Sequence, residues 1–169
     1  SGAFDRVSAE RLLYKLRLVG VHGSLLAILR SWLKWRSANV VVDGAKSTRF
    51  YLSNSVYQGT TWGPPLWNTF FADSRFSIED AGFQASIFAD DLKVFRGFCG
   101  GTDEQIIFEA LRNCQSKLHY WGAANQVSFD DTKEHFAILH QRQKIGENFK
   151  LLGVIFDTQL KMEKMTCEM

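Results

Sequence analysis

The sequence predicts an α+β fold, with a two-layer antiparallel sheet and helices packed on one face of it. Two observations predict this class. Amphipathic runs with helical spacing alternate along the chain with short strand-like runs, and neighbouring strand-like runs are joined by tight turns such as Asp43-Gly44. Strands joined by short turns pair antiparallel, because a parallel pair needs a long crossover. This order therefore favours a two-layer domain over a doubly wound parallel sheet.

Two helices and a hairpin are expected in the first third of the chain. Ser8 can cap a helix whose apolar residues recur every three or four positions, and Gly20 is placed to end it. Ser24 opens a second amphipathic helix. Residues 39–52 hold two strand-like runs around Asp43-Gly44, a dipeptide typical of hairpin turns. This segment is therefore expected to form a hairpin.

The middle of the chain predicts a third helix and a second hairpin. Pro64 or Pro65 suits the first turn of a helix that runs through residues 66–76. Residues 83–88 and 92–96 are strand-like, and the three residues between them are Ala-Asp-Asp. We therefore expect strand, tight turn and strand over this stretch.

The last third predicts a long helix followed by strands. Thr102 and Gln105 form a capping-box pattern for the helix, and Gly122 is expected to end it. Residues 136–140 and 149–156 then read as strand-like runs.

Composition limits the class of protein. The 169 residues are 46% hydrophobic and include only two prolines, which is typical of one globular domain with its own core. The three cysteines form no CxxC pair, which argues against a disulfide framework and a structural zinc site. No apolar run approaches the ~18 residues of a membrane span, and no signal peptide is recognisable. We expect an intracellular protein, in the nucleus or the cytoplasm, with no membrane partner.

The net charge of +2 conceals an uneven distribution. Residues 1–50 carry nine Lys and Arg against three Asp and Glu, whereas residues 51–131 carry five against ten. The basic residues of the first third, Lys15 among them, are interleaved with Trp32 and Trp35, a combination compatible with binding to a nucleic-acid backbone. The same pattern is typical of a solvated helix surface, so composition leaves both interpretations open.

Asp90 and Asp91, here called the acidic doublet, stand at the turn of the second expected hairpin between mostly apolar strands. Burying two like charges unpaired is costly, so the turn must leave both in water or bring them to a cation. A rigid hairpin that holds carboxylates at a sheet edge suits Mg²⁺, which prefers a few carboxylates together with substrate phosphates. An Asp-Asp pair alone is also typical of a solvated turn.

Five stretches, in order, resemble the motifs of reverse transcriptase palm domains, particularly those of non-LTR (LINE-type) retroelements. "FADD" at residues 88–91 resembles the Tyr/Phe-x-Asp-Asp hairpin of that family. Residues 1–20 resemble the first motif and residues 58–73, "QGTTWGPPLWNTFFAD", the second. Residues 121–136 resemble the fourth motif, and "FKLLGVIFD" at residues 149–157 resembles the fifth, the primer grip. Five ordered motifs are far more specific than any one of them.

The resemblance implies a palm-like fold and an RNA-directed DNA polymerase. Its partners would be an RNA template, a DNA primer and deoxynucleoside triphosphates. It implies that Asp90 and Asp91 hold Mg²⁺ or Mn²⁺, with two ions in the complete enzyme, during nucleotidyl transfer to the primer 3′-hydroxyl. Lys133 would be the third catalytic residue, a proton donor to the leaving pyrophosphate. Without the resemblance, Lys133 reads as a surface lysine.

Three further residues would contact the nucleotide or the templating base pair. Phe4 would be the steric gate beneath the incoming sugar, or else a core residue. Gln58 and Gly59 would lie under the templating base pair, because glycine lets the backbone approach a ligand closely. Gly59 is otherwise a loop glycine before a helix. The Leu152-Gly153 turn would brace the primer or merely close a hairpin.

The resemblance also divides the chain and implies missing parts. Residues 1–147 would form the palm core, and residues 148–169 the primer-grip-like hairpin with the start of the thumb connection. The family's first motif places a metal-binding Asp two residues before the position of Ser1, and fingers and thumb segments of the parent protein are expected to complete the enzyme. Asp5 is no substitute, because it lies where the strand turns into a helix. This chain alone is therefore expected to be inactive.

Two alternatives stay open. One is a catalytically dead retroelement remnant that acts at most as a nucleic-acid-binding domain, and the bulk of Trp62, Pro65 and Trp67 in the second motif, which could crowd the nucleotide pocket, favours it. The other is a different Mg²⁺-dependent phosphoryl-transfer enzyme, such as an RNA-templated RNA polymerase or a phosphatase. The second is disfavoured, because the matches around Gln58 and Leu152 would then be coincidences.

Overall fold

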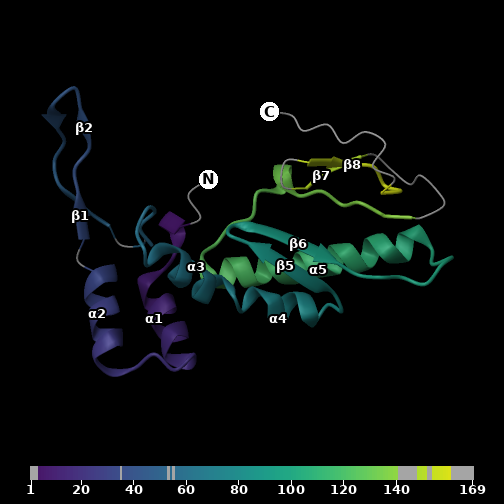
Figure 1. Ribbon diagram of the computed structural model, residues 1–169, viewed down its shortest axis with the longest axis horizontal. Helices are drawn as coiled ribbons and strands as arrows, with labels where there is room; N and C mark the ends of the chain where they lie inside the picture. Colours follow the sequence, from purple (N-terminus) through teal and green to yellow (C-terminus); the bar gives the residue numbers. More distant parts are fainter. Residues whose placement is uncertain are drawn as a thin grey trace. The chain divides into compact units, whose positions relative to one another are not determined.

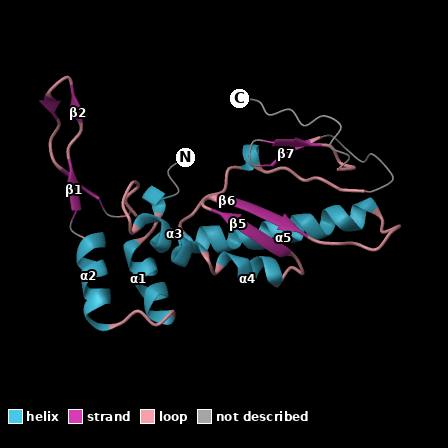
Figure 2. Cartoon of the chain, in the orientation of Figure 1, coloured by secondary structure: helices cyan, strands magenta, loops and turns pink. Residues whose placement is uncertain are grey.

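The computed structural model describes residues 4–34, 36–52, 54, 56–140, 148–151 and 154–160. The chain divides into two compact units, Ser1–Phe129 and Asp130–Met169. The described ranges combine helices with four small antiparallel sheets of two strands each, so the predicted α+β class is confirmed (Figures 1 and 2). The arrangement as one two-layer sheet stays a prediction, as does the division after residue 147.

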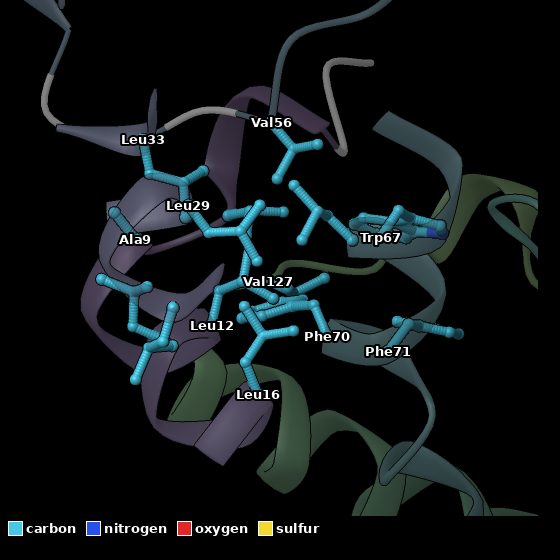
Figure 3. Packing of buried hydrophobic residues seen from close by; sticks show 14 of the residues in the cluster. Ala9, Leu12, Leu16, Leu29, Leu33, Val56, Trp67, Phe70, Phe71 and Val127 are labelled. Carbon is cyan, nitrogen blue, oxygen red and sulfur yellow. The ribbon is translucent and has the colours of Figure 1, made fainter. Parts of the chain in front are cut away.

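Three helices of the first unit enclose its larger core. After the 3₁₀ turn η1 (Phe4–Arg6), these are α1 (Ala9–Leu18), α2 (Gly23–Leu33) and α3 (Gly63–Phe71). Each has apolar residues at three- or four-residue spacing, so one face of each helix is buried. The buried side chains meet between the helices in Figure 3, and they include Leu12, Leu16, Leu29, Leu33, Trp67, Phe70 and Phe71.

The segment between α2 and α3 forms two short antiparallel ladders. Strand β1 (Arg36–Ala38) pairs with β4 (Phe50–Leu52), and β2 (Val41–Val42) pairs with β3 (Ala45–Lys46). Asp43 and Gly44 both have positive φ, +48° and +82°, as a two-residue hairpin turn requires. The predicted hairpin is therefore confirmed, and the valines of β2 are exposed.

The rest of the first unit packs helices against a second hairpin. It consists of α4 (Ser74–Glu79), β5 (Gln84–Phe88), β6 (Asp91–Phe95) and α5 (Glu104–Asn125). The β5–β6 ladder runs from the pair Gln84 and Phe95 to the pair Phe88 and Asp91, which confirms the predicted strand, turn and strand. One face of the hairpin, with Ala85, Leu92 and Val94, packs against a smaller core formed by Ile78, Phe83, Cys114 and Leu118.

Two predicted helix boundaries are wrong. The third helix is not continuous through residue 76, because α3 ends at Phe71 and α4 begins at Ser74. The long helix does not end at Gly122 but continues to Asn125, and Gln126 adopts the left-handed conformation there. Gly122 is buried instead, and a Cβ at this position would lie 2.6 Å from the carbonyl oxygen of Val127. Its glycine serves a close approach of two backbone segments.

The cap of α5 also differs from the prediction. Asp103 is the N-cap, and its carboxylate accepts a hydrogen bond of 2.8 Å from the backbone N–H of Gln105. Thr102 stands one residue before the N-cap, and its hydroxyl donates to the carbonyl oxygen of Cys99. None of the described helices is both long and apolar enough to cross a membrane.

The second unit holds a 3₁₀ turn, η2 (Asp131–Lys133), and a hairpin of β7 (Phe149–Leu151) and β8 (Val154–Phe156). Phe149 pairs with Phe156, and their rings stack with centroids 5.6 Å apart. The hairpin predicted over residues 149–156 is confirmed, whereas its Leu152-Gly153 turn lies outside the described residues. Residues 136–140 form no strand. Phe136 and Leu139 are about half exposed there, so this run buries no continuous apolar face.

Candidate functional site

The acidic doublet lies at the tip of the β5–β6 hairpin. Phe88 and Asp91 are the last pair of the ladder, so Ala89 and Asp90 form a two-residue turn. Both carboxylates are exposed, as one of the two alternatives for this turn required. Asp91 is fixed by strand pairing and Asp90 by the turn. The two side chains are therefore carried by adjacent, well-defined backbone positions.

The turn is held from the core of the unit. The indole Nε1–H of Trp67 donates a hydrogen bond of 2.8 Å to the carbonyl oxygen of Ala89. Trp67 is only 2% exposed, and its ring stacks with those of both Phe4 and Phe71, with each centroid distance at 5.1 Å. Trp67 therefore fills the core instead of standing at an open surface, and sequence reasoning missed its contact with the turn.

Phe4, the predicted sugar gate, meets the same tryptophan. It is half-buried in η1, and its carbonyl oxygen accepts a hydrogen bond of 2.8 Å from the backbone N–H of Val56. Trp67 thus joins Phe4 to the turn that carries the acidic doublet. Asp5, the next residue, is exposed. The role of Phe4 toward a nucleotide stays a prediction.

Gln58 and Gly59 lie in the loop that leads into α3, and both are exposed. Gly59 has a φ of +75°, a conformation that favours glycine, and a Cβ there would meet no atom within 4 Å. The loop is closed by the Thr60 hydroxyl, which donates to the carbonyl oxygen of Tyr57 at 2.7 Å. Space beside Gly59 is open, which is compatible with the predicted contact with a base pair.

Lys133, the predicted proton donor, belongs to the second unit and is exposed in η2. Its ammonium lies 3.7 Å from a carboxylate oxygen of Asp130. Hydrogen bonds from the hydroxyl and the backbone N–H of Thr132, aided by the charge of Lys133, lower the pKa of Asp130. Asp130 thus has a local structural role, and a catalytic role for Lys133 stays a prediction.

The chemistry of the acidic doublet suits a divalent ion that is shared with a substrate. Carboxylate oxygens are the ligands that Mg²⁺ prefers, and this ion commonly keeps waters and phosphate oxygens in its other positions. Within the described ranges, no three His, Cys, Asp or Glu side chains come together as a closed metal cage. Two exposed carboxylates on adjacent residues therefore fit an open site.

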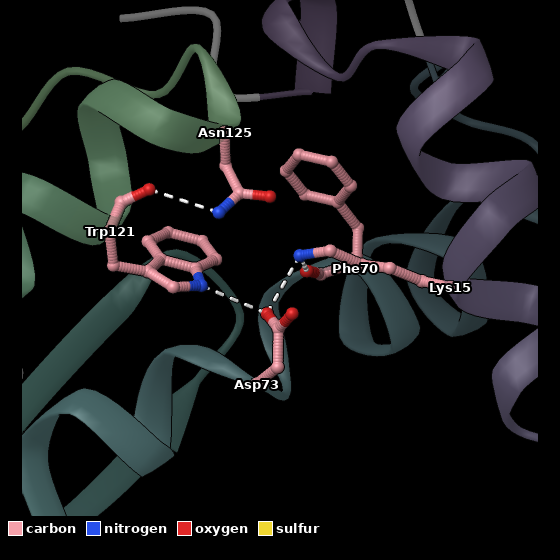
Figure 4. Close-up of polar contacts among 5 residues, drawn as sticks. All are labelled: Lys15, Phe70, Asp73, Trp121 and Asn125. Atoms are coloured by element: carbon pink, nitrogen blue, oxygen red, sulfur yellow. Dashed lines mark hydrogen bonds and ion pairs between the residues drawn. The ribbon is translucent and has the colours of Figure 1, made fainter. Parts of the chain in front are cut away.

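A lysine that sequence reasoning placed on a basic surface is instead partly buried beside the core (Figure 4). The ammonium of Lys15 donates to the carbonyl oxygen of Phe70 and to a carboxylate oxygen of Asp73, both at 2.7 Å. The indole N–H of Trp121 donates to the same oxygen of Asp73 at 3.0 Å. Burial lowers the pKa of Lys15, and its hydrogen bond with Asp73 opposes that shift. Its position three residues after Leu12, on the apolar face of α1, was the available signal.

One exposed basic residue that stacks on aromatic rings in the first unit is Arg36. The guanidinium of Arg36 lies 4.4 Å from the ring centroid of Tyr57 and 5.5 Å from that of Trp32. The two rings meet edge to face at 5.1 Å. Cations stacked on aromatic rings occur in nucleic-acid-binding surfaces, although they also serve structure alone.

Comparison with known proteins shows the family to which the sequence belongs. The family model for reverse transcriptase (RNA-dependent DNA polymerase) matches residues 1–156. The chain is 30% identical over 139 residues to the RNA-directed DNA polymerase from mobile element jockey of Drosophila funebris, which covers 78% of this chain and 14% of that protein. It is 32% identical over 97 residues to the corresponding jockey protein of Drosophila melanogaster, covering 54% of this chain and 10% of that protein. These matches confirm the resemblance that the five motifs predicted.

Proposed function

Because the chain belongs to the reverse transcriptase (RNA-dependent DNA polymerase) family, we propose that it forms the catalytic hairpin region of an RNA-directed DNA polymerase from a mobile element. The observation that carries the proposal is the position of the acidic doublet: two exposed carboxylates on a turn that is hydrogen-bonded to a buried core residue. The family comprises nucleotidyltransferases that generally use divalent metal ions. A catalytically dead remnant is not favoured by the comparisons.

In this proposal the chain's own residues bind and orient the reactants. Asp90 and Asp91 hold Mg²⁺, which when bound favours ionisation of the primer 3′-hydroxyl and neutralises charge on the triphosphate. Phe4 lies beneath the incoming sugar. Lys133 donates a proton to the departing pyrophosphate. Gly59, with open space beside its backbone, supports the templating base pair together with its neighbour Gln58.

The proposed partners are an RNA template, a DNA primer and deoxynucleoside triphosphates. The chain spans about a seventh or less of the length of the jockey proteins that it matches, so the proposal concerns a longer polymerase that contains it. Exposed arginines such as Arg17, Arg30 and Arg36 would contact phosphates, and affinity for an RNA–DNA hybrid should then fall steeply as salt rises. If the affinity did not depend on salt, these arginines would be interpreted as solvated surface residues that do not contact phosphates.

The activity test places this chain in a complete polymerase of its element. Asp90→Asn and Asp91→Asn should each lower Mg²⁺-dependent primer extension on RNA by about a thousandfold or more, because each removes a charged ligand. Asp43→Asn is the matched control: it changes an exposed aspartate in another two-residue turn, where Asn-Gly is equally favourable. Its activity should stay near that of the wild type. Extension that survives both doublet substitutions would refute the proposal.

A further inference from the structure

The backbone of the acidic turn is unfavourable for its sequence. Ala89 has a φ of +54°, in the left-handed region that alanine avoids because its Cβ crowds the backbone. Two-residue hairpin turns usually place glycine, asparagine or aspartate at such a position. The turn therefore needs support from outside its own four residues.

That support comes from a donor with no other described partner. The indole N–H of Trp67 is buried with its ring, so it cannot bond to bulk water, and the Ala89 carbonyl oxygen at 2.8 Å satisfies it. A buried donor left unpaired is costly, so the bond resists any rotation of the turn that would carry the carbonyl away. The contact thus fixes the peptide that joins Ala89 to Asp90.

The direction of the donor is itself fixed by stacking. The ring of Trp67 stacks with those of Phe4 and Phe71, at interplanar angles of 25° and 15°. A flat ring stacked on two neighbouring rings cannot swing its N–H away from the hairpin without losing those contacts. The geometry points to Trp67 as a positioning residue, which sets the orientation of the Asp90 and Asp91 carboxylates and couples it to Phe4.

This inference deepens the proposed function. It rests on that function only in assuming that the carboxylates of Asp90 and Asp91 bind a metal ion. The hydrogen bond and its effect on the turn can be measured without a metal ion or a substrate. Trp67→Phe keeps an aromatic ring in the stack and removes the donor. Trp121→Phe is the matched control, because it also removes a buried indole hydrogen bond, the one to Asp73, away from the acidic turn.

The experiment is heteronuclear NMR on the 169-residue chain. In the wild type, a nuclear Overhauser contact is expected between the Trp67 indole proton and the backbone of the Ala89–Asp90 peptide. In Trp67→Phe, the Ala89 Cα and Cβ shifts should move toward unstructured values, and amide exchange at Asp91 should rise about tenfold. Trp121→Phe should leave both at wild-type values. The inference is overturned if Trp67→Phe and Trp121→Phe show the same Ala89 shifts and the same Asp91 amide exchange. If Trp67→Phe does not fold, the wild-type spectrum decides: absence of the nuclear Overhauser contact between the Trp67 indole proton and the Ala89–Asp90 peptide overturns the inference.

A Mn²⁺ titration then separates positioning from metal use. Broadening of the Asp90 and Asp91 amides should require several-fold more Mn²⁺ in Trp67→Phe than in Trp121→Phe, because the carboxylates are less well oriented. If Mn²⁺ leaves the wild-type turn unchanged while Trp67→Phe still alters the Ala89 shifts, the positioning inference stands and the proposed metal site fails. If Mn²⁺ binds equally to both variants, the inference is wrong and the metal site stands.

Discussion

Two hairpins of the first unit turn on two residues each, yet they stabilise those turns by different means. In β2–β3 the turn is Asp43-Gly44, a sequence that favours positive φ at both positions. In β5–β6 only Ala89 has positive φ, and its carbonyl is held by Trp67, 22 residues earlier in the chain. One turn is specified by its own sequence, and the other is imposed by the core.

The surroundings of the two hairpins differ in the same sense. The valines of β2 are 58% and 63% exposed, so this hairpin has little apolar contact. The β5–β6 hairpin packs Ala85, Leu92 and Val94 against the smaller core. Apolar burial contributes most of the stability of a sheet face. The hairpin with the less favourable turn sequence is therefore the one with the better tertiary support.

The largest expected effect comes from removing that support. Trp67→Ala should lower the free energy of unfolding by about 3–5 kcal/mol, because it removes the ring that stacks with Phe4 and Phe71 and deletes the hydrogen bond to Ala89. Urea unfolding followed by circular dichroism measures it. Trp62→Ala, at a side chain 44% exposed, should cost about 0.5 kcal/mol or less. Equal losses in the two variants would show that the core does not depend on the stack.

The ion pair that ties α1 to the base of α4 should have a smaller effect. Lys15→Met keeps the apolar stem and removes the ammonium, which should cost about 1–2 kcal/mol because two hydrogen bonds are lost while Asp73 regains water. Amide exchange should rise in α4, and hence in β5–β6, but not in β2–β3. Faster exchange in β2–β3 instead would contradict the proposed independence of the two hairpins.

The same lysine predicts a pH dependence. Burial lowers the pKa of Lys15 in the folded state, so between that pKa and its ordinary value near 10.5 the unfolded chain binds a proton that the native chain has released. Stability contributed by Lys15 therefore rises with pH across this window. The rise should be visible as the difference between wild type and Lys15→Met in urea unfolding at successive pH values. If the free energy of unfolding of the wild type relative to Lys15→Met falls as pH rises, the pKa of Lys15 is raised in the folded state and burial is not the dominant cause.

Changes at the turns themselves should be smaller. Gly44→Ala places a Cβ at a φ of +82° and should weaken β2–β3 by about 1 kcal/mol, although no neighbouring atom lies within 4 Å. Gly97→Ala, with open space and no left-handed φ, is the control and should be nearly neutral. Amide exchange within β2–β3 measures the difference. No change in Gly44→Ala would mean that this turn is not specified locally.

The smallest single effect is expected for Ala89→Gly, within about 0.5 kcal/mol, because relief of the left-handed strain is offset by greater freedom in the unfolded chain. Its value lies in combination. Glycine should partly restore the turn in Trp67→Phe, which a double-mutant cycle on hairpin amide exchange would detect. Strictly additive effects of the two substitutions would show that the conformation of the turn is not energetically coupled to the Trp67 indole.

What could be predicted from sequence was local. The hairpin at residues 83–96 and the acidic doublet at its tip follow from alternating apolar residues and a turn. The bond from Trp67 to Ala89 has no local signature, because it joins a helix to a turn 22 residues away. Gly122 has an ordinary helix-ending signal, and only the packed neighbour at Val127 shows that the glycine serves a close approach instead. Contacts between segments that are distant in the sequence could not be predicted from the local pattern of residues.

The acceptor in the Trp67 contact is a main-chain oxygen, which every amino acid possesses. Mutation at residue 89 can therefore change the conformational strain of the turn, but it cannot delete the hydrogen bond. Mutation at residue 67 can delete it. As copies of a mobile element diverge, we expect residues other than glycine, asparagine and aspartate to be tolerated at position 89 wherever an indole occupies position 67. Lineages that lose the indole should compensate by acquiring glycine, asparagine or aspartate in the turn.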